Sequence, residues 1–178
     1  MLVTSDILYL VASIKSKPEI VEPVAASLNS RFNEARLNTP LRMAHFLAQA
    51  AHETDGFHTL QEYASGRAYE GRKDLGNTEP GDGVRYKGRG IFQLTGRANY
   101  RNFGDYLKLD LENNPMLASD PDVSVRIALA YWDWHKLNDF ADMDDVKRIT
   151  RRINGGYNGL ESRIIYLQRA KKALGYTP

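Results

Sequence analysis

The sequence contains no cysteine, which excludes disulfide bonds and thiolate metal sites, so packing and polar contacts alone must hold the fold. It also has no apolar run long enough to span a bilayer. Its first residues do not combine a basic segment, an apolar run and a cleavage site, as a secretory signal peptide does. We therefore expect a protein without an integral membrane segment that is made in the cytoplasm without a signal peptide.

The sequence has neither internal repeats nor a series of alternating apolar and polar segments, which predicts a mainly α class. Its length of 178 residues and its 42% apolar composition are typical of one domain, here 1–178. Residues 66–96 are rich in glycine and predict a long loop with at most a short β-hairpin near 86–94. Apolar residues at helical spacing predict helices at 5–14, 18–32, 39–56, 99–109, 120–137, 142–153 and 160–174.

The segment 39–56 is the helix around which we expect the rest to be arranged. Thr39 and Pro40 suit an N-cap and a first helical position, and Gly56 suits the position after the C-terminus. A polar stripe repeats beside the apolar one, which predicts a core-facing side and a wet side. Glu53 falls in the last turn, where the helix dipole disfavours a negative charge and favours a protonated carboxyl. Such a group suits a general acid, although an ordinary exposed glutamate fits the same pattern.

A second carboxylate, Glu62, follows nine residues later, just past the glycine that ends the helix. Two carboxylates on either side of a helix end can face each other across a cleft. Glycoside hydrolysis needs such a pair, one protonated for the leaving oxygen and one ionised for water or the sugar. The spacing alone is a weak signal, because glutamates nine residues apart are common.

The segment 85–100 contains glycines at 88, 90 and 96 that allow the backbone to approach a flat ligand. Gln93 and Thr95 are two residues apart, so on a strand they would face the same side. Their side chains offer donors and acceptors for sugar hydroxyls or for a water. A glycine-rich surface loop with polar decoration is the alternative interpretation.

Several other signals are declined. The glycines at 88 and 90 do not form a nucleotide loop, because Gln93 replaces the third glycine and no strand and helix units alternate around them. The four histidines have no metal-ligand spacing, so we expect no metal and no cofactor. Of the two tryptophans we expect one core anchor, on the Trp134 side of its helix. The net charge is +2, and a basic segment at 147–172 fits a polyanionic partner or a solvated face, without pointing to nucleic acid.

Four motifs occur in a distinctive order: His-Glu-Thr-Asp-Gly-Phe at 52–57, the glycine-rich segment 69–83, the segment 85–100, and Arg-Ile-Asn-Gly-Gly at 152–156. Together they resemble the family 19 glycoside hydrolases, the plant-type chitinases, and more closely their phage endolysin branch. The resemblance covers roughly 39–174. It implies a lysozyme-like, two-lobed helical domain with a cleft between its lobes.

The resemblance also implies roles for seven residues. Glu53 matches the general acid, Glu62 is the best candidate for the general base, and Thr95 matches the residue that holds the attacking water. The remaining four are expected to contact or support the substrate site: Gln93 and Asn154 as substrate contacts, Tyr100 as an aromatic sugar contact and Arg163 as the arginine that keeps the base ionised. The implied mechanism is inverting, with a single displacement.

From this resemblance we expect an endolysin-type hydrolase that cleaves β-1,4 bonds in the glycan strands of bacterial peptidoglycan. It would act as a monomer on the cell wall after synthesis in the host bacterial cytoplasm, released by a separate pore-forming protein. Absence of the family's cysteine-rich chitin-binding module favours such a compact lysin. Two alternatives remain open: a chitinase of the same chemistry, and a glycan-binding module without catalytic activity.

Overall fold

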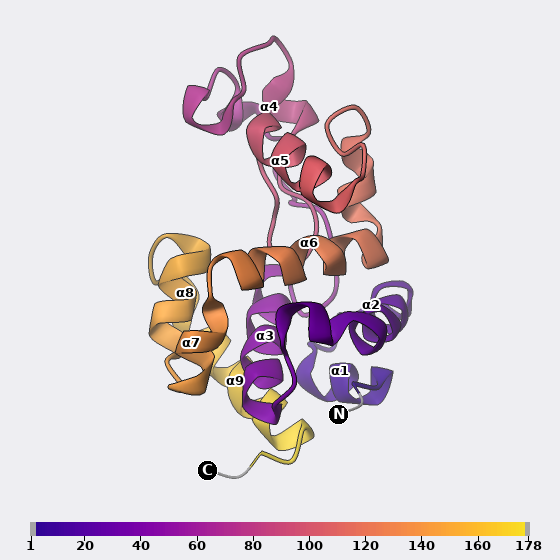
Figure 1. The fold of residues 1–178 in the computed structure, drawn as a ribbon, viewed down its shortest axis with the longest axis vertical. Helices are drawn as coiled ribbons and strands as arrows, with labels where there is room; N and C mark the ends of the chain where they lie inside the picture. Colours follow the sequence, from indigo (N-terminus) through magenta and orange to yellow (C-terminus); the bar gives the residue numbers. More distant parts are fainter. Residues whose placement is uncertain (1–2, 177–178) are drawn as a thin grey trace.

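The computed structural model describes residues 3–176, and helices dominate it, as the sequence predicted (Figure 1). The expected hairpin is reduced to two single-residue bridges, Gln61 with Arg89 and Arg89 with Leu94. None of the helices in the described part of the chain has the length and apolarity needed to cross a bilayer. The helices are α1 (Ser5–Val11), α2 (Pro18–Arg31), α3 (Pro40–Glu53), α4 (Asp82–Arg85), α5 (Arg97–Leu107), α6 (Pro121–Trp134), α7 (Leu137–Asp142), α8 (Val146–Asn154) and α9 (Leu160–Ala173), with 3-10 turns η1 (Phe32–Ala35), η2 (Arg67–Tyr69), η3 (Lys73–Leu75) and η4 (Pro115–Ser119).

The molecule has two lobes, and α6 runs between them (Figure 1). The large lobe contains α1 to α3 and α7 to α9, and the small lobe contains α4, α5 and the long loop. One face of α6 contributes Val125, Leu129 and Trp132 to the large-lobe core. Another face contributes Val123 and Ile127 to the small-lobe core. Because both cores share this helix, its position fixes the space between the lobes.

The central helix α3 begins as predicted, with the Thr39 side chain accepting a hydrogen bond from the Arg42 amide. Its expected wet side is wrong in the middle of the helix, because His45 and Gln49 are as fully buried as the apolar residues around them, whereas Arg42 and His52 of the same stripe are half-buried. The reason is tertiary: His45 Nε2 lies 2.8 Å from Asp144 Oδ1, and Gln49 accepts a hydrogen bond from Arg163. The helical spacing of polar residues in the sequence does not distinguish a buried polar group that has such a partner from an exposed one.

Two other expectations need correction. The segment 142–153 is not one helix, because α7 ends at Asp142 and the Asp145 side chain caps a new helix by accepting from the Arg148 amide. The buried tryptophan of α6 is Trp132 and not Trp134, which is 43% exposed. The Trp132 indole donates a hydrogen bond to Asn138 at 2.8 Å, so its polar atom has a partner inside the core.

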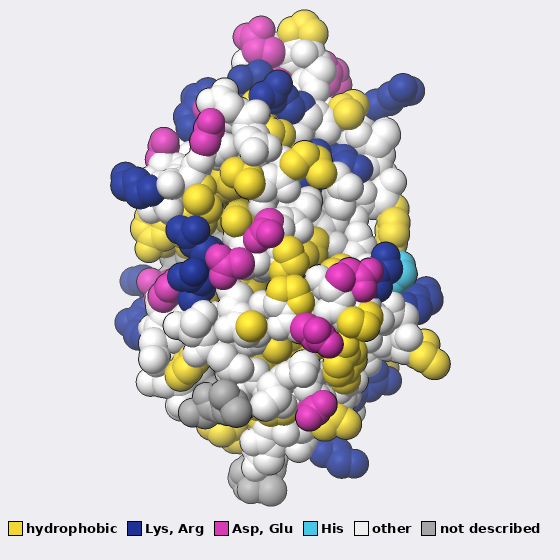
Figure 2. Space-filling model, turned by 90° about the vertical axis from the view of Figure 1, so that its right-hand side faces the viewer, with side chains coloured by type: hydrophobic (Ala, Val, Ile, Leu, Met, Phe, Trp, Pro, Cys, Tyr) yellow, Lys and Arg dark blue, Asp and Glu magenta, His cyan; other side chains and the backbone are white. Residues whose placement is uncertain are grey.

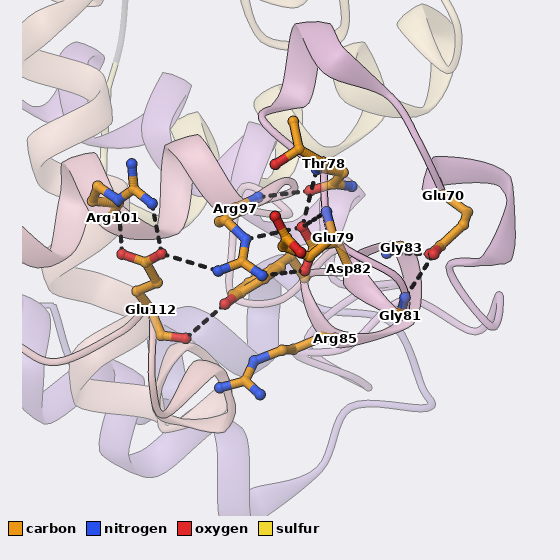
Figure 3. A network of polar contacts seen from close by, with 12 residues as sticks. Glu70, Thr78, Glu79, Gly81, Asp82, Gly83, Arg85, Arg97, Arg101 and Glu112 are labelled. Carbon is orange, nitrogen blue, oxygen red and sulfur yellow. Dashed lines mark hydrogen bonds and ion pairs between the residues drawn. The ribbon is translucent and has the colours of Figure 1, made fainter.

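The glycine-rich loop of the small lobe is fixed by a network of carboxylates (Figure 3). Asp82, at 1% side-chain exposure, pairs with Arg97 at 2.5 Å and accepts from the Thr78 and Glu79 amides. Arg97 also contacts Glu112, at 3.3 Å. Beyond these, Glu112 pairs with Arg101, and Glu70 accepts from the Gly81 and Gly83 amides. The loop is therefore an ordered wall of the small lobe.

The buried pair in this network should carry much of the small lobe's stability. Asp82→Asn leaves the Arg97 guanidinium without its main counter-charge, so we expect a loss of about 3 kcal/mol in the free energy of unfolding, measured in urea. Asp74→Asn is the matched control on the same loop, because Asp74 pairs with Arg72 at 62% exposure and should contribute little. Equal losses in the two variants would contradict this account.

The same pair predicts a pH dependence. Hydrogen bonds from Arg97 hold the pKa of Asp82 below its usual range, against the opposite effect of burial. A carboxyl whose pKa is lower in the folded state stabilises the fold above its unfolded pKa of about 3.9 and loses that contribution as the pH falls through the folded value. The stability gap between wild type and Asp82→Asn should therefore be full at pH 7 and shrink below about pH 4.

Candidate active site

Glu53 is the last residue of α3, and the chain around it is tightly fixed. The Thr54 hydroxyl donates to the Ala50 carbonyl and accepts from the Phe57 amide. The left-handed backbone begins at Asp55, one residue before the expected Gly56, which also has a positive φ. A side chain at Gly56 would collide with Ser13, so the end of α3 rests against the end of α1. These contacts fix the backbone at the end of α3, from which the Glu53 side chain extends.

Arg163 is completely buried under α3, and it contacts Glu53 rather than the expected Glu62. Its guanidinium donates to Gln49 Oε1 and to Glu53 Oε1, both at 2.5 Å, while the Glu53 side chain is 17% exposed. A buried guanidinium requires a nearby negative charge. The prediction that Arg163 supports the base is therefore wrong in its partner, because α9 packs along α3 and brings this residue to the helix end.

Glu62 lies on the other side of the helix break. Its amide donates to the Gly88 carbonyl at 3.0 Å, and its Oε2 accepts from the Tyr69 hydroxyl at 3.0 Å. Burial, and then this hydrogen bond, raise the pKa of Tyr69, so the phenol remains a donor. Glu62 Oε1 is buried and has no partner among the described residues. It is thus an acceptor left unpaired beside Tyr69.

Gly88 is the meeting point of the polar side chains around Glu62. A Cβ placed there would lie 2.7 Å from Gln93 Oε1, 3.1 Å from Glu62 Oε2 and 3.3 Å from Thr95 Oγ1. The structure thus brings Gln93 and Thr95 to one side, although on a turn and not on a strand. Gln93 has a positive φ, and the Thr95 hydroxyl donates to the Gln93 carbonyl at 2.8 Å. Only glycine at 88 leaves room for this cluster.

The two remaining candidate residues, Tyr100 and Asn154, differ in their exposure. Tyr100 is fully buried, and burial raises its pKa to about 12. Its hydroxyl donates to the Lys87 carbonyl and accepts from Arg89, so it supports the segment that carries Gly88. The expected sugar contact at Tyr100 is therefore wrong, since no sugar can reach its ring. Asn154 is exposed at the C-terminal end of α8.

A cleft of about 400 Å³ lies beside these groups and has walls from both lobes. Its lining includes Gln93 and Thr95, which connect it to Glu62. On the α6 side, burial raises the pKa of Tyr131, Arg152 opposes this effect, and the Glu53 charge adds to it. The lining residues are Leu75, Phe92, Gln93, Leu94, Thr95, Asn99, Phe103, Ile127, Tyr131, Trp134, His135 and Ile153.

Sequence reasoning missed Asn99, Trp134 and His135 as cleft residues. Trp134 was expected in the core, but it lies at the surface. The centre of its ring is 4.7 Å from the centre of the Phe103 ring and 4.8 Å from the centre of the Tyr106 ring. Helical spacing was the available signal. Positions 127, 131 and 134 of α6, and position 135 directly after it, share one side of the helix. Within the described residues, no group of three or more histidine, aspartate or glutamate side chains is placed to hold a metal ion.

Two carboxyls with different polar partners, near a cleft between two helical lobes, are an arrangement that glycoside hydrolysis can use. The family model described as chitinase class I matches residues 33–146. The chain is also 31% identical over 177 residues to a glycosyl hydrolase family 19 domain-containing protein of Haemophilus influenzae, covering 82% of this chain and 86% of that protein. The chain therefore belongs to glycoside hydrolase family 19 and is a chitinase-like enzyme.

Other relatives are named as chitinases. Chitinase 11 of Oryza sativa subsp. japonica is 38% identical over 92 residues, which are 51% of this chain and 34% of that protein. The chain thus spans about a third of such plant relatives. Chitinase C from Streptomyces griseus has a similar fold, with a TM-score of 0.79 and 24% identity over 99% of this chain and 78% of that one. A bacterial family 19 chitinase gives a TM-score of 0.77 and 23% identity over 100% of this chain and 97% of that one.

The pair of Glu53 and Arg163 should show unequal costs when either partner is removed. Glu53→Gln leaves a completely buried guanidinium without a counter-charge, so we expect a loss of about 3–5 kcal/mol in the free energy of unfolding. Arg163→Met leaves a carboxyl that is partly exposed to water, and it should cost less. The double variant should recover part of the first loss in a double-mutant cycle. Strictly additive losses would contradict the importance of this contact.

Proposed function

We propose that this enzyme cleaves β-1,4 glycosidic bonds of bacterial peptidoglycan by general acid and base catalysis with inversion. Glu53 is the proposed acid, and Glu62 is the proposed base. The observation that carries the assignment is the buried Oε1 of Glu62, which has no partner among the described residues, while the other oxygen is held by Tyr69 next to Gln93 and Thr95. A water bound to that oxygen and positioned by Thr95 would be the nucleophile of a single displacement.

Charge supports peptidoglycan as the substrate. Chitin is neutral, whereas peptidoglycan strands carry carboxylates on their peptide stems. Arg152 lies beside the cleft, and its positive charge adds to the effect of burial in lowering the pKa of the cleft residue His135.

We further propose an endolysin role, in which the monomeric enzyme is made in the host bacterial cytoplasm and reaches the wall when a separate pore-forming protein admits it. The names of the plant and Streptomyces relatives favour the alternative, a chitinase.

The acid assignment predicts that Glu53→Gln loses a factor of roughly 10² to 10⁴ in rate, because the amide cannot give up a proton. Since this variant should also be less stable, turnover is measured below its unfolding transition on protein verified by circular dichroism. Glu62→Gln should be similarly impaired.

The control is Glu22→Gln, at an exposed position of α2, which should keep wild-type activity. Glu70 is unsuitable as a control because its carboxylate holds the loop. A folded Glu53→Gln protein with near wild-type turnover would remove Glu53 from the mechanism.

The substrate and the stereochemistry are tested together with purified peptidoglycan sacculi and chitohexaose. We expect soluble fragments from sacculi, and mass spectrometry of their reducing ends identifies the bond that is cut. Nuclear magnetic resonance of the first products should show the α anomer at the new reducing end. Release of chitooligosaccharides with no release from sacculi would establish the chitinase alternative instead, and the β anomer would reject inversion.

A further inference from the structure

Helix α8 carries a concentration of positive charge that the catalytic site does not use. Lys147, Arg148, Arg151 and Arg152 are all exposed on it. Arg148 pairs with Asp145 at 3.3 Å, whereas no acidic side chain within residues 3–176 lies within ion-pair distance of Arg151 or Arg152. The face shown in Figure 2 is different, because acidic and basic side chains are interspersed there. The positive field is thus unbalanced on α8.

The three arginines of this helix surround a recess between α7 and α8, with a volume of about 280 Å³. Its lining consists of Phe140, Arg148, Arg151, Arg152 and Gly155. The Arg148 guanidinium lies over the Phe140 ring, 6.0 Å from its centre, which restrains one wall. Gly155 ends the helix with a positive φ, and a Cβ there would meet nothing within 4 Å, so this side is open. Cations in the last turn of a helix stabilise its dipole, which fits Arg151 and Arg152, whereas Arg148 in the first turn is held by Asp145 and Phe140.

The recess adjoins the substrate cleft. The Tyr131 hydroxyl donates to the Arg152 carbonyl at 3.1 Å, and Tyr131 lines the cleft. Ile153, the next residue of α8, also lines it. Arg152 thus borders this wall through its backbone, and its charge adds to the effect of burial in lowering the pKa of His135. A polymer lying in the cleft would therefore hold its side branches within reach of the arginines.

We propose that the α8 recess binds carboxylates of the peptide stems of peptidoglycan while the glycan strand occupies the cleft. This inference rests on the proposed function, because only a glycan with acidic branches has such groups. Guanidinium and carboxylate pair through two parallel hydrogen bonds, and several arginines around one recess accommodate stems of variable conformation. Chitin has no carboxylate, so the recess adds nothing to its binding. The recess thus makes the enzyme selective for peptidoglycan.

The test compares wild type with the double variant Arg151→Gln/Arg152→Gln on three substrates. These are intact sacculi, glycan strands freed of their stems by an amidase, and chitohexaose. The matched control is Lys15→Gln/Lys172→Gln, which removes the same charge from exposed positions outside the recess. Thermal unfolding verifies that every variant is folded. The readouts are kcat and KM on each substrate at two salt concentrations.

We expect the arginine variant to raise KM on intact sacculi roughly tenfold with kcat unchanged, as for the loss of two partly exposed charge-assisted contacts. Stripped strands and chitohexaose should change less than about twofold, and the lysine control should stay near wild type. An equal loss on stripped strands would overturn the stem-binding proposal. An equal loss in the lysine control that disappears in high salt would also overturn it, in favour of general attraction to an anionic wall. If wild type cleaves chitohexaose but neither form of peptidoglycan, the proposed function itself fails.

Discussion

The arrangement of the site depends on the contacts that the buried guanidinium of Arg163 makes. It joins α9 to α3 through Gln49 in the middle of the helix and Glu53 at its end. A completely buried positive charge cannot remain uncompensated, so the end of α3 must stay where Glu53 can reach it. The same carboxyl is the proposed acid. One interaction therefore sets both the packing of the large lobe and the position of a reacting group.

The other constraint is the sharing of α6 between two cores. Trp132 anchors this helix in the large lobe, and Ile127 packs into the small lobe. Tyr131, between them in the chain, faces the cleft. Across the cleft, the segment carrying Gly88 is held by buried Tyr100, while the Asp82 network fixes the loop beyond it. The two walls thus belong to two packed cores that share α6, and no disulfide is needed to hold them.

Local signals predicted most of the helices and the start of α3 well, because a cap such as Thr39 acts through contacts within four residues. They failed where a distant partner decided the outcome. His45 and Gln49 have polar side chains at helical spacing, and only Asp144 and Arg163, about a hundred residues away, make them interior. The spacing of Gln93 and Thr95 predicted that they share a side, and the resemblance to the family added Glu62 to the same site. The meeting of Arg163 with Glu53, and the burial of Tyr100, depend on tertiary packing that no motif encodes.

The environment of Glu53 also bears on how it can act as the proposed acid. Its carboxyl contacts the completely buried Arg163 guanidinium, while 17% of its side chain stays exposed. Arg163 also donates to Gln49, so the position of the guanidinium does not depend on Glu53 alone. The carboxyl is thus oriented from its buried side and accessible from the other, and a positioned proton donor needs such an arrangement.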